Sequence, residues 1–110
     1  MIKVLTFAIG LLSYASMVTA DAIEQGKDIA ADRNKGNCLS CHFVPEGEMT
    51  GNVAPPLIQM KFRYPDKAAL RQQIWDATVR NPESSMPPYG RHAILTEQEI
   101  DLVLEYVYSL

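Results

Sequence analysis

The chain has 110 residues with a formal net charge of −3 at pH 7, and 47% of the residues are hydrophobic. This length allows one domain. The slightly acidic balance gives no indication of nucleic-acid binding, which requires clusters of basic residues.

The first twenty residues are typical of a secretory signal peptide. Lys3 supplies a positive charge, residues 4–12 are apolar but too short to span a bilayer, and Val18-Thr19-Ala20 offers small residues for cleavage. We therefore expect residues 1–20 to be removed on export to the periplasm and residues 21–110 to form the mature domain. The alternative is a retained membrane anchor. No later stretch is apolar enough to predict a transmembrane helix, so we expect no membrane association after cleavage.

Helices and loops alternate in the first part of the mature chain. Residues 21–34 predict a first helix with Asp21 as its N-cap and Gly36 as its stop. Residues 43–65 contain several glycines and prolines and predict a long loop. A loop of this length in a small domain indicates that it wraps around something.

Two further helices are predicted in the second part. Residues 66–81 predict a helix that Asp66 caps and Asn81-Pro82 ends, and residues 81–95 predict a second loop. Residues 96–110 predict the clearest helix, because Thr96 and Glu99 form a capping box and apolar residues recur at helical spacing. No stretch alternates as a strand does. The sequence therefore predicts an all-α domain, with helices and loops around a cofactor.

That cofactor is indicated by residues 38–42, which read Cys-x-x-Cys-His, the attachment motif of a c-type haem. In this chemistry Cys38 and Cys41 form thioether bonds to the haem vinyl groups, and His42 gives an imidazole nitrogen to the iron. The alternatives are weaker. A zinc site would need more ligands than His42 and His92, and a thioredoxin-like dithiol would need a βαβ context. A plain structural disulfide would carry no haem.

The second axial ligand is predicted to be Met86, which lies in a loop that Pro87-Pro88 stiffen. The alternatives are Met60, Met49 and His92, of which His92 would give a bis-histidine haem of lower potential. An open sixth position, as in a gas-binding haem protein, is disfavoured by so well placed a methionine. A carbonyl of Pro55 or Pro56 is a candidate acceptor for the other ring N–H of His42. Candidates to neutralise the haem propionates are Arg91, Lys61 and Arg63.

These motifs occur in the order found in small class I cytochromes c, which the chain resembles over nearly all of its mature part. The sequence is more closely similar to the SoxX family, the monohaem subunits of the SoxAX complex of sulfur oxidation. The segments that carry this resemblance are residues 36–42, 55–61, 64–67, 73–78 and 81–92. The runs Ile74-Trp75-Asp76 and Gly90-Arg91-His92 favour the narrower family. One departure is Ala54, which replaces the glycine of the usual Gly-Pro-Pro-Leu loop.

The resemblance implies one haem c, held covalently by Cys38 and Cys41, with His42 and Met86 as axial ligands. It implies a heterodimer with a SoxA-type haem subunit. This complex would conjugate thiosulfate to a cysteine of the carrier SoxYZ. This chain would relay the electrons to a soluble cytochrome c. It has no third cysteine to act as a nucleophile, so it would be a non-catalytic redox subunit of that thiosulfotransferase. The alternative is a free periplasmic electron shuttle.

Overall fold

The computed structural model describes the backbone of residues 10–110 and the side chains from residue 20 onward. Within residues 10–110, four α-helices follow one another: α1 (Gly10–Ala31), α2 (Met60–Arg63), α3 (Lys67–Trp75) and α4 (Glu97–Tyr108). Two short 3₁₀ helices, η1 (Cys38–Ser40) and η2 (Ala77–Val79), complete the order. Residues 10–110 contain no strand, which confirms the predicted all-α class.

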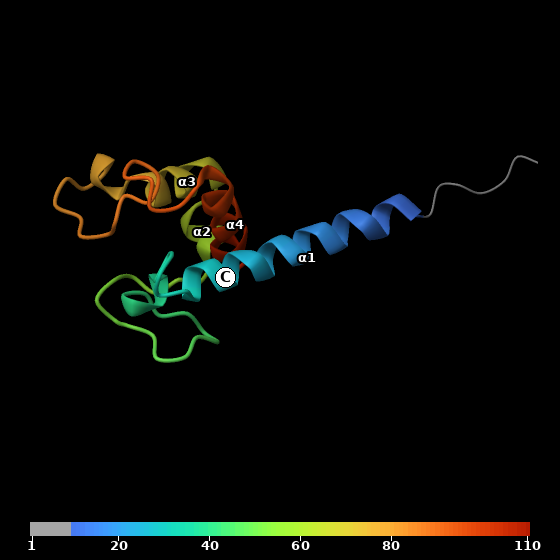
Figure 1. Ribbon diagram of the computed structural model, residues 1–110, viewed down its shortest axis with the longest axis horizontal. Helices are drawn as coiled ribbons and strands as arrows, with labels where there is room; N and C mark the ends of the chain where they lie inside the picture. The colour runs from blue at the N-terminus through green and yellow to red at the C-terminus, as the bar shows by residue number, and fades with distance from the viewer. Residues whose placement is uncertain (1–9) are drawn as a thin grey trace, which may run out of the picture.

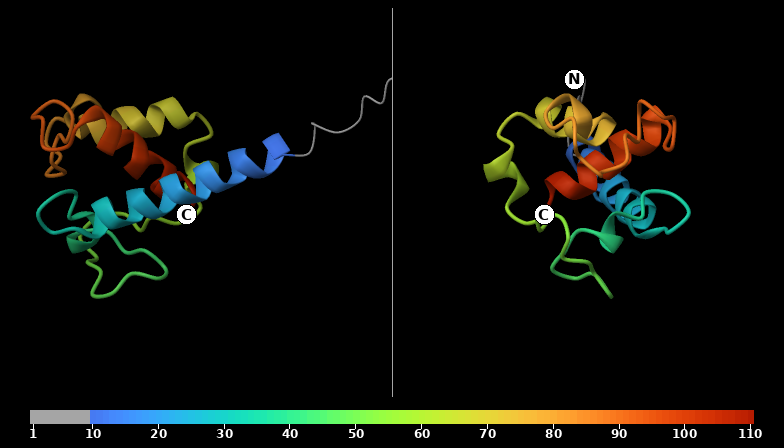
Figure 2. Two further views of the ribbon diagram at one scale, coloured as in Figure 1. Left: turned by 45° about the vertical axis from the view of Figure 1, so that its right-hand side comes forward. Right: turned by 90° about the vertical axis from the view of Figure 1, so that its left-hand side faces the viewer.

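Helices α1 and α4 form the main helix pair and cross at close range (Figure 1). Gly26 makes this approach possible, because a Cβ atom at this position would lie 2.0 Å from the carbonyl oxygen of Leu102. Ala30, Ile100 and Val103 are buried at the pair. The N-terminal part of α1 extends away from the rest of the molecule, and the two long loops gather at the opposite end (Figure 2).

Helix α1 differs from its predicted bounds at both ends. It begins at Gly10 rather than at Asp21, so Asp21 is not an N-cap, and its carboxylate instead accepts a hydrogen bond from Gln25 at 2.8 Å. Residues 11–20 contain no glycine or proline to interrupt a helix. The helix ends at Ala31, because the Asp32 carboxylate accepts the N–H of Asn34 at 2.8 Å and favours a turn.

The predicted signal peptide stays a prediction. Residues 1–9 lie outside the described residues, and residues 10–20 are helical. No helix within the described part of the chain has the length and apolar character needed to cross a membrane.

Helix α3 begins as predicted and ends early. The Asp66 side chain accepts the N–H of Ala68 at 3.0 Å, which confirms the N-cap. The helix ends at Trp75 rather than at residue 81, because Asp76 adopts an extended conformation and its carboxylate accepts the N–H of Thr78 at 3.0 Å. This Asp76 cap starts η2. Helix α2, a single turn, lies within a segment predicted to be loop.

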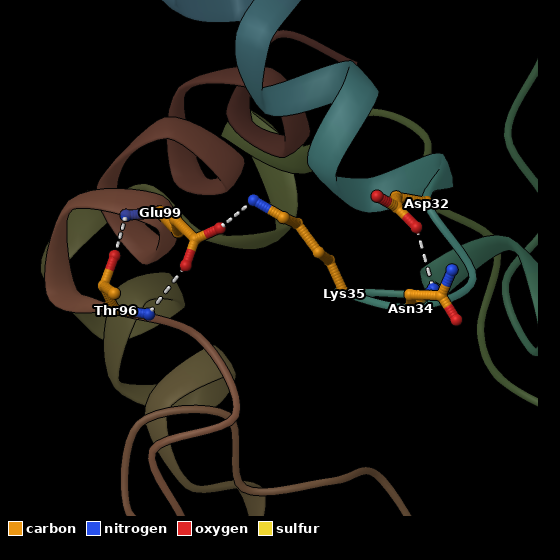
Figure 3. Close-up of polar contacts among 5 residues, drawn as sticks. All are labelled: Asp32, Asn34, Lys35, Thr96 and Glu99. Carbon is orange, nitrogen blue, oxygen red and sulfur yellow. Dashed lines mark hydrogen bonds and ion pairs between the residues drawn. The ribbon is translucent and has the colours of Figure 1, made fainter.

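Helix α4 confirms the predicted capping box. Thr96 Oγ1 accepts the N–H of Glu99 and Glu99 Oε1 accepts the N–H of Thr96, both at 3.1 Å (Figure 3). The other carboxylate oxygen of Glu99 pairs with Lys35 Nζ at 2.6 Å. This pair connects the segment just before the Cys-x-x-Cys-His motif to the first turn of α4. Two more pairs join α3 to α4, Lys67 with Glu105 at 2.5 Å and Arg71 with Asp101 at 2.7 Å.

Candidate haem site

A cavity of about 780 Å³ is lined by residues of both long loops, and all four predicted site residues line it. Cys38, Cys41 and His42 come from η1 and the residues after it, and Met86 comes from the loop before α4. The volume falls within the range of about 300–1,000 Å³ typical of small-molecule and cofactor sites. Much of the remaining lining is apolar and belongs to the core: Leu57, Met60, Leu70, Ile74, Tyr89, Leu95, Val103 and Val107.

The Cys-x-x-Cys-His motif is wound as one tight helical turn. The carbonyl of Cys38 accepts the N–H of Cys41 at 3.2 Å and the N–H of His42 at 2.9 Å. Asn37 enters the turn in the left-handed region (φ 51°), and its side chain accepts the hydroxyl of Ser40 at 2.6 Å. Both cysteines are free, and burial raises the pKa of Cys38 to about 11. The turn thus places both thiols at one side of the cavity.

His42 is oriented by the proline loop. Its Nδ1 lies 2.6 Å from the carbonyl oxygen of Pro55, which confirms one of the two predicted acceptors. A carbonyl only accepts, so Nδ1 carries the proton and Nε2 keeps its lone pair for a metal. The neighbouring carbonyl of Pro56 accepts a hydrogen bond from Arg63 Nη1 at 2.5 Å. The two prolines therefore connect His42 to α2 through consecutive carbonyls.

The long loop folds back on the motif through its main chain. Gly51 N–H donates to the carbonyl of Leu39 at 2.7 Å, and Ala54 N–H donates to the carbonyl of Cys41 at 3.0 Å. A Cβ atom at Gly51 would lie 2.1 Å from the Ser40 carbonyl oxygen. Ala54 is not among the residues with positive φ, so alanine is compatible with the backbone at this position.

The structure separates the four candidates for the second axial ligand. Met49 is 88% exposed and His92 is exposed, and neither lines the cavity. Met86 and Met60 both line it. Met60 is only 2% exposed, and its sulfur already lies 3.4 Å from Arg63 Nη1. Met86 is half-buried and packs against the core from an irregular loop.

Basic side chains outnumber acidic ones around the cavity. Arg63 lines it, as predicted for a partner of the propionates, but Lys61 and Arg91 do not. Arg33 and Lys35 line it as well and were missed by the sequence interpretation. Both could have been predicted from the sequence, because they are basic residues that lie just before the Cys-x-x-Cys-His motif.

Comparison with known proteins agrees with these features. Residues 21–107 match the model of the family described as cytochrome c oxidase, cbb3-type, subunit III, a range that includes the motif and Met86. An uncharacterized lipoprotein of Aquifex aeolicus (strain VF5) is 30% identical over 76 residues, which are 68% of this chain and 37% of that protein. The chain thus spans well under half the length of this relative.

Proposed function

We propose that this chain, which belongs to the family of the cytochrome c oxidase cbb3-type subunit III, is an electron-transfer protein with one covalently attached haem. The observation that carries the proposal is the Cys38-to-His42 turn, whose histidine is held by the Pro55 carbonyl at 2.6 Å beside a cavity of about 780 Å³. Cysteine, histidine and an apolar cavity are the donors and surroundings that a c-type haem requires.

Each group of residues has a separate task in this proposal. Cys38 and Cys41 attach the ring, and His42 coordinates the iron through Nε2. The buried side chains of the lining exclude water, and Arg33 and Arg63 offer cations to the propionates. The haem, once bound, supplies one-electron oxidation and reduction. A Pro55 carbonyl that accepts from Nδ1 makes the imidazole a better electron donor to a metal.

Met86 is proposed as the second axial ligand. Its thioether is a soft donor that favours a high reduction potential, and with both axial positions filled by protein the site suits electron transfer. Met60 is the alternative within the cavity. The Arg63 guanidinium at 3.4 Å from the Met60 sulfur would have to move before that sulfur could bind iron.

Absorption spectra of matched leucine variants test the ligand set. Leucine conserves the volume of methionine, so Met86→Leu, Met60→Leu and Met49→Leu should all fold. We expect wild type and Met49→Leu to show a c-type spectrum with a weak far-red sulfur–iron band when oxidised, and Met86→Leu alone to lose that band. A band that disappears in Met60→Leu instead would assign Met60. A purified protein without a haem spectrum, made with the haem-attachment machinery present, would refute the whole proposal.

The finer proposal is that the protein works as a SoxX-type subunit in the periplasm. Its support is the resemblance of five segments, together with the two cysteines of the chain, which haem attachment would use fully. The segments at residues 74–76 and 90–92 also contact one another, because Arg91 Nε pairs with Asp76 Oδ2 at 2.8 Å. In this role the chain takes electrons from a SoxA-type subunit during thiosulfate conjugation to SoxYZ and passes them to a soluble cytochrome c.

A reconstitution separates this role from that of a free shuttle. We expect the haem protein to form a heterodimer with a SoxA-type cytochrome, and thiosulfate to reduce its haem only when that partner and SoxYZ are both present. The control is the same protein with thiosulfate alone. A protein that stays monomeric beside its partner, yet exchanges electrons with soluble cytochromes, would be the free shuttle.

A further inference from the structure

The loop that carries Met86 is attached to the domain at a point a few residues further on. The N–H groups of Gly90 and Arg91 both donate to the carbonyl of Trp75, at 3.1 and 3.3 Å. Arg91 Nε also pairs with Asp76 Oδ2 at 2.8 Å. Since Trp75 is the last residue of α3, the end of that helix holds the returning side of the Met86 loop.

Gly90 makes this attachment close. A Cβ atom at this residue would lie 2.0 to 2.6 Å from atoms of the Trp75 indole, so the backbone of the loop lies directly against the ring. The indole is itself in contact with Arg71, whose guanidinium carbon lies 5.6 Å from the ring centroid. The loop backbone thus packs against the Trp75 indole, and Arg71 of the same helix, α3, contacts that indole.

Asp76 uses both carboxylate oxygens at this junction. Oδ1 accepts the N–H of Thr78 at 3.0 Å and its hydroxyl at 2.5 Å, and Oδ2 faces Arg91. The carboxylate side chain is 8% exposed, whereas the Arg91 side chain is 51% exposed. The buried Asp76 carboxylate thus starts η2 and pairs with Arg91, which links the end of α3 to the Met86 loop.

We propose that Asp76 and Arg91 are positioning residues for Met86, which hold the loop so that the methionine stays at the cavity. The chain from Arg91 back to Met86 contains Pro87-Pro88 and the buried Tyr89, so a restraint at Arg91 is transmitted through a stiff segment. This inference rests on the proposed function, because it assigns the purpose of the pair to ligation by Met86.

Competition by imidazole measures how firmly Met86 is held. Added imidazole binds the oxidised haem protein only when the methionine leaves, so a looser loop gives a tighter apparent imidazole affinity. For Arg91→Gln we expect the affinity to tighten about threefold, the effect of losing one partly exposed ion pair. Asp76→Asn should tighten it similarly, because asparagine still caps η2 but leaves Arg91 unpaired. The double variant should have the same imidazole affinity as either single variant, because both changes remove the same ion pair. The imidazole affinity of Arg91→Lys should be closer to that of wild type.

Two variants serve as controls. Lys67→Gln removes an ion pair between α3 and α4 away from the loop, and Arg80→Gln removes an exposed arginine for which the described residues provide no ion-pair partner. Neither should change imidazole affinity. An unchanged affinity in Arg91→Gln, or an equal change in Lys67→Gln, would overturn the inference. A wild-type protein without haem or without the far-red band would instead refute the proposed function, so the two failures are distinguishable.

Discussion

The crossing of α1 and α4 leaves no room for a side chain at Gly26, and this makes Gly26→Ala a severe test of the fold. The added Cβ atom would lie 2.0 Å from the carbonyl oxygen and 2.6 Å from the carbonyl carbon of Leu102, and 2.9 Å from Tyr106 Cβ. Two of these atoms belong to the backbone and cannot rotate away. The helices must therefore separate, and overpacking of this kind costs up to about 3 kcal/mol.

Alanine also brings a gain, because it is favoured over glycine inside a helix by about 1 kcal/mol. The net loss in the free energy of unfolding is therefore up to about 2 kcal/mol. With a typical urea dependence for a small domain, the unfolding midpoint should fall by about 1 M. The measurement is urea unfolding of the haem-loaded protein, followed by far-ultraviolet circular dichroism.

The exposed neighbour Lys27 supplies the control. Lys27→Ala changes the same turn of α1 without entering the crossing, and we expect its free energy of unfolding to stay within about 0.5 kcal/mol of the wild-type value. If Gly26→Ala were as stable as Lys27→Ala or more stable, helix propensity would outweigh the clash. The packing of α1 against α4 would then not depend on backbone contact at Gly26.

Two further predictions concern the polar contacts near the motif. The hydrogen bond from Lys35 lowers the pKa of Glu99 from its ordinary value of 4.5, so the ionised carboxylate stabilises the fold above that value, and this contribution is lost as the pH falls through the lowered pKa. The difference in urea midpoint between wild type and Glu99→Gln should therefore shrink as the pH falls from about 6 through the lowered pKa of the carboxylate, and a constant difference would contradict the assignment. Tyr89→Phe leaves the buried Gly36 carbonyl without its hydroxyl donor. It should lower the free energy of unfolding, measured by thermal unfolding, by about 1–3 kcal/mol. Tyr108→Phe, whose hydroxyl lies 3.4 Å from the Pro65 carbonyl at an exposed position, should change little.

Local signals predicted the parts of the fold that depend on neighbouring residues. The Thr96 and Glu99 capping box and the Asp66 cap were predictable, because each is a contact between residues a few positions apart. The end of α3 was not, since Asp76 was interpreted as an interior helix residue and its carboxylate instead caps η2. Nor did the start of α1 follow from Asp21, because no helix breaker separates it from the residues before it.

The candidate site was predictable where a motif defines it. Residues 38–42, a proline carbonyl for His42 and Met86 were all expected, and the cavity brings these together. The contact of Arg63 with the Met60 sulfur was not predicted, although the two residues are only three positions apart, because the helical turn α2 that contains both lies in a segment predicted to be loop. Pairs such as Lys35 with Glu99 join residues far apart in a sequence with many charges, so spacing alone could not select them.

The two sides of the cavity differ in how far along the chain their contacts reach. His42 hydrogen-bonds to Pro55, 13 residues away, whereas Tyr89, three residues after Met86, hydrogen-bonds to Gly36, 53 residues away. Closing a longer segment of chain costs more entropy, and contacts that are distant in sequence form later. The histidine side should therefore assemble first during folding, and the methionine side should close last. Under mild denaturant the same order runs in reverse, with the methionine side opening while the histidine side remains intact.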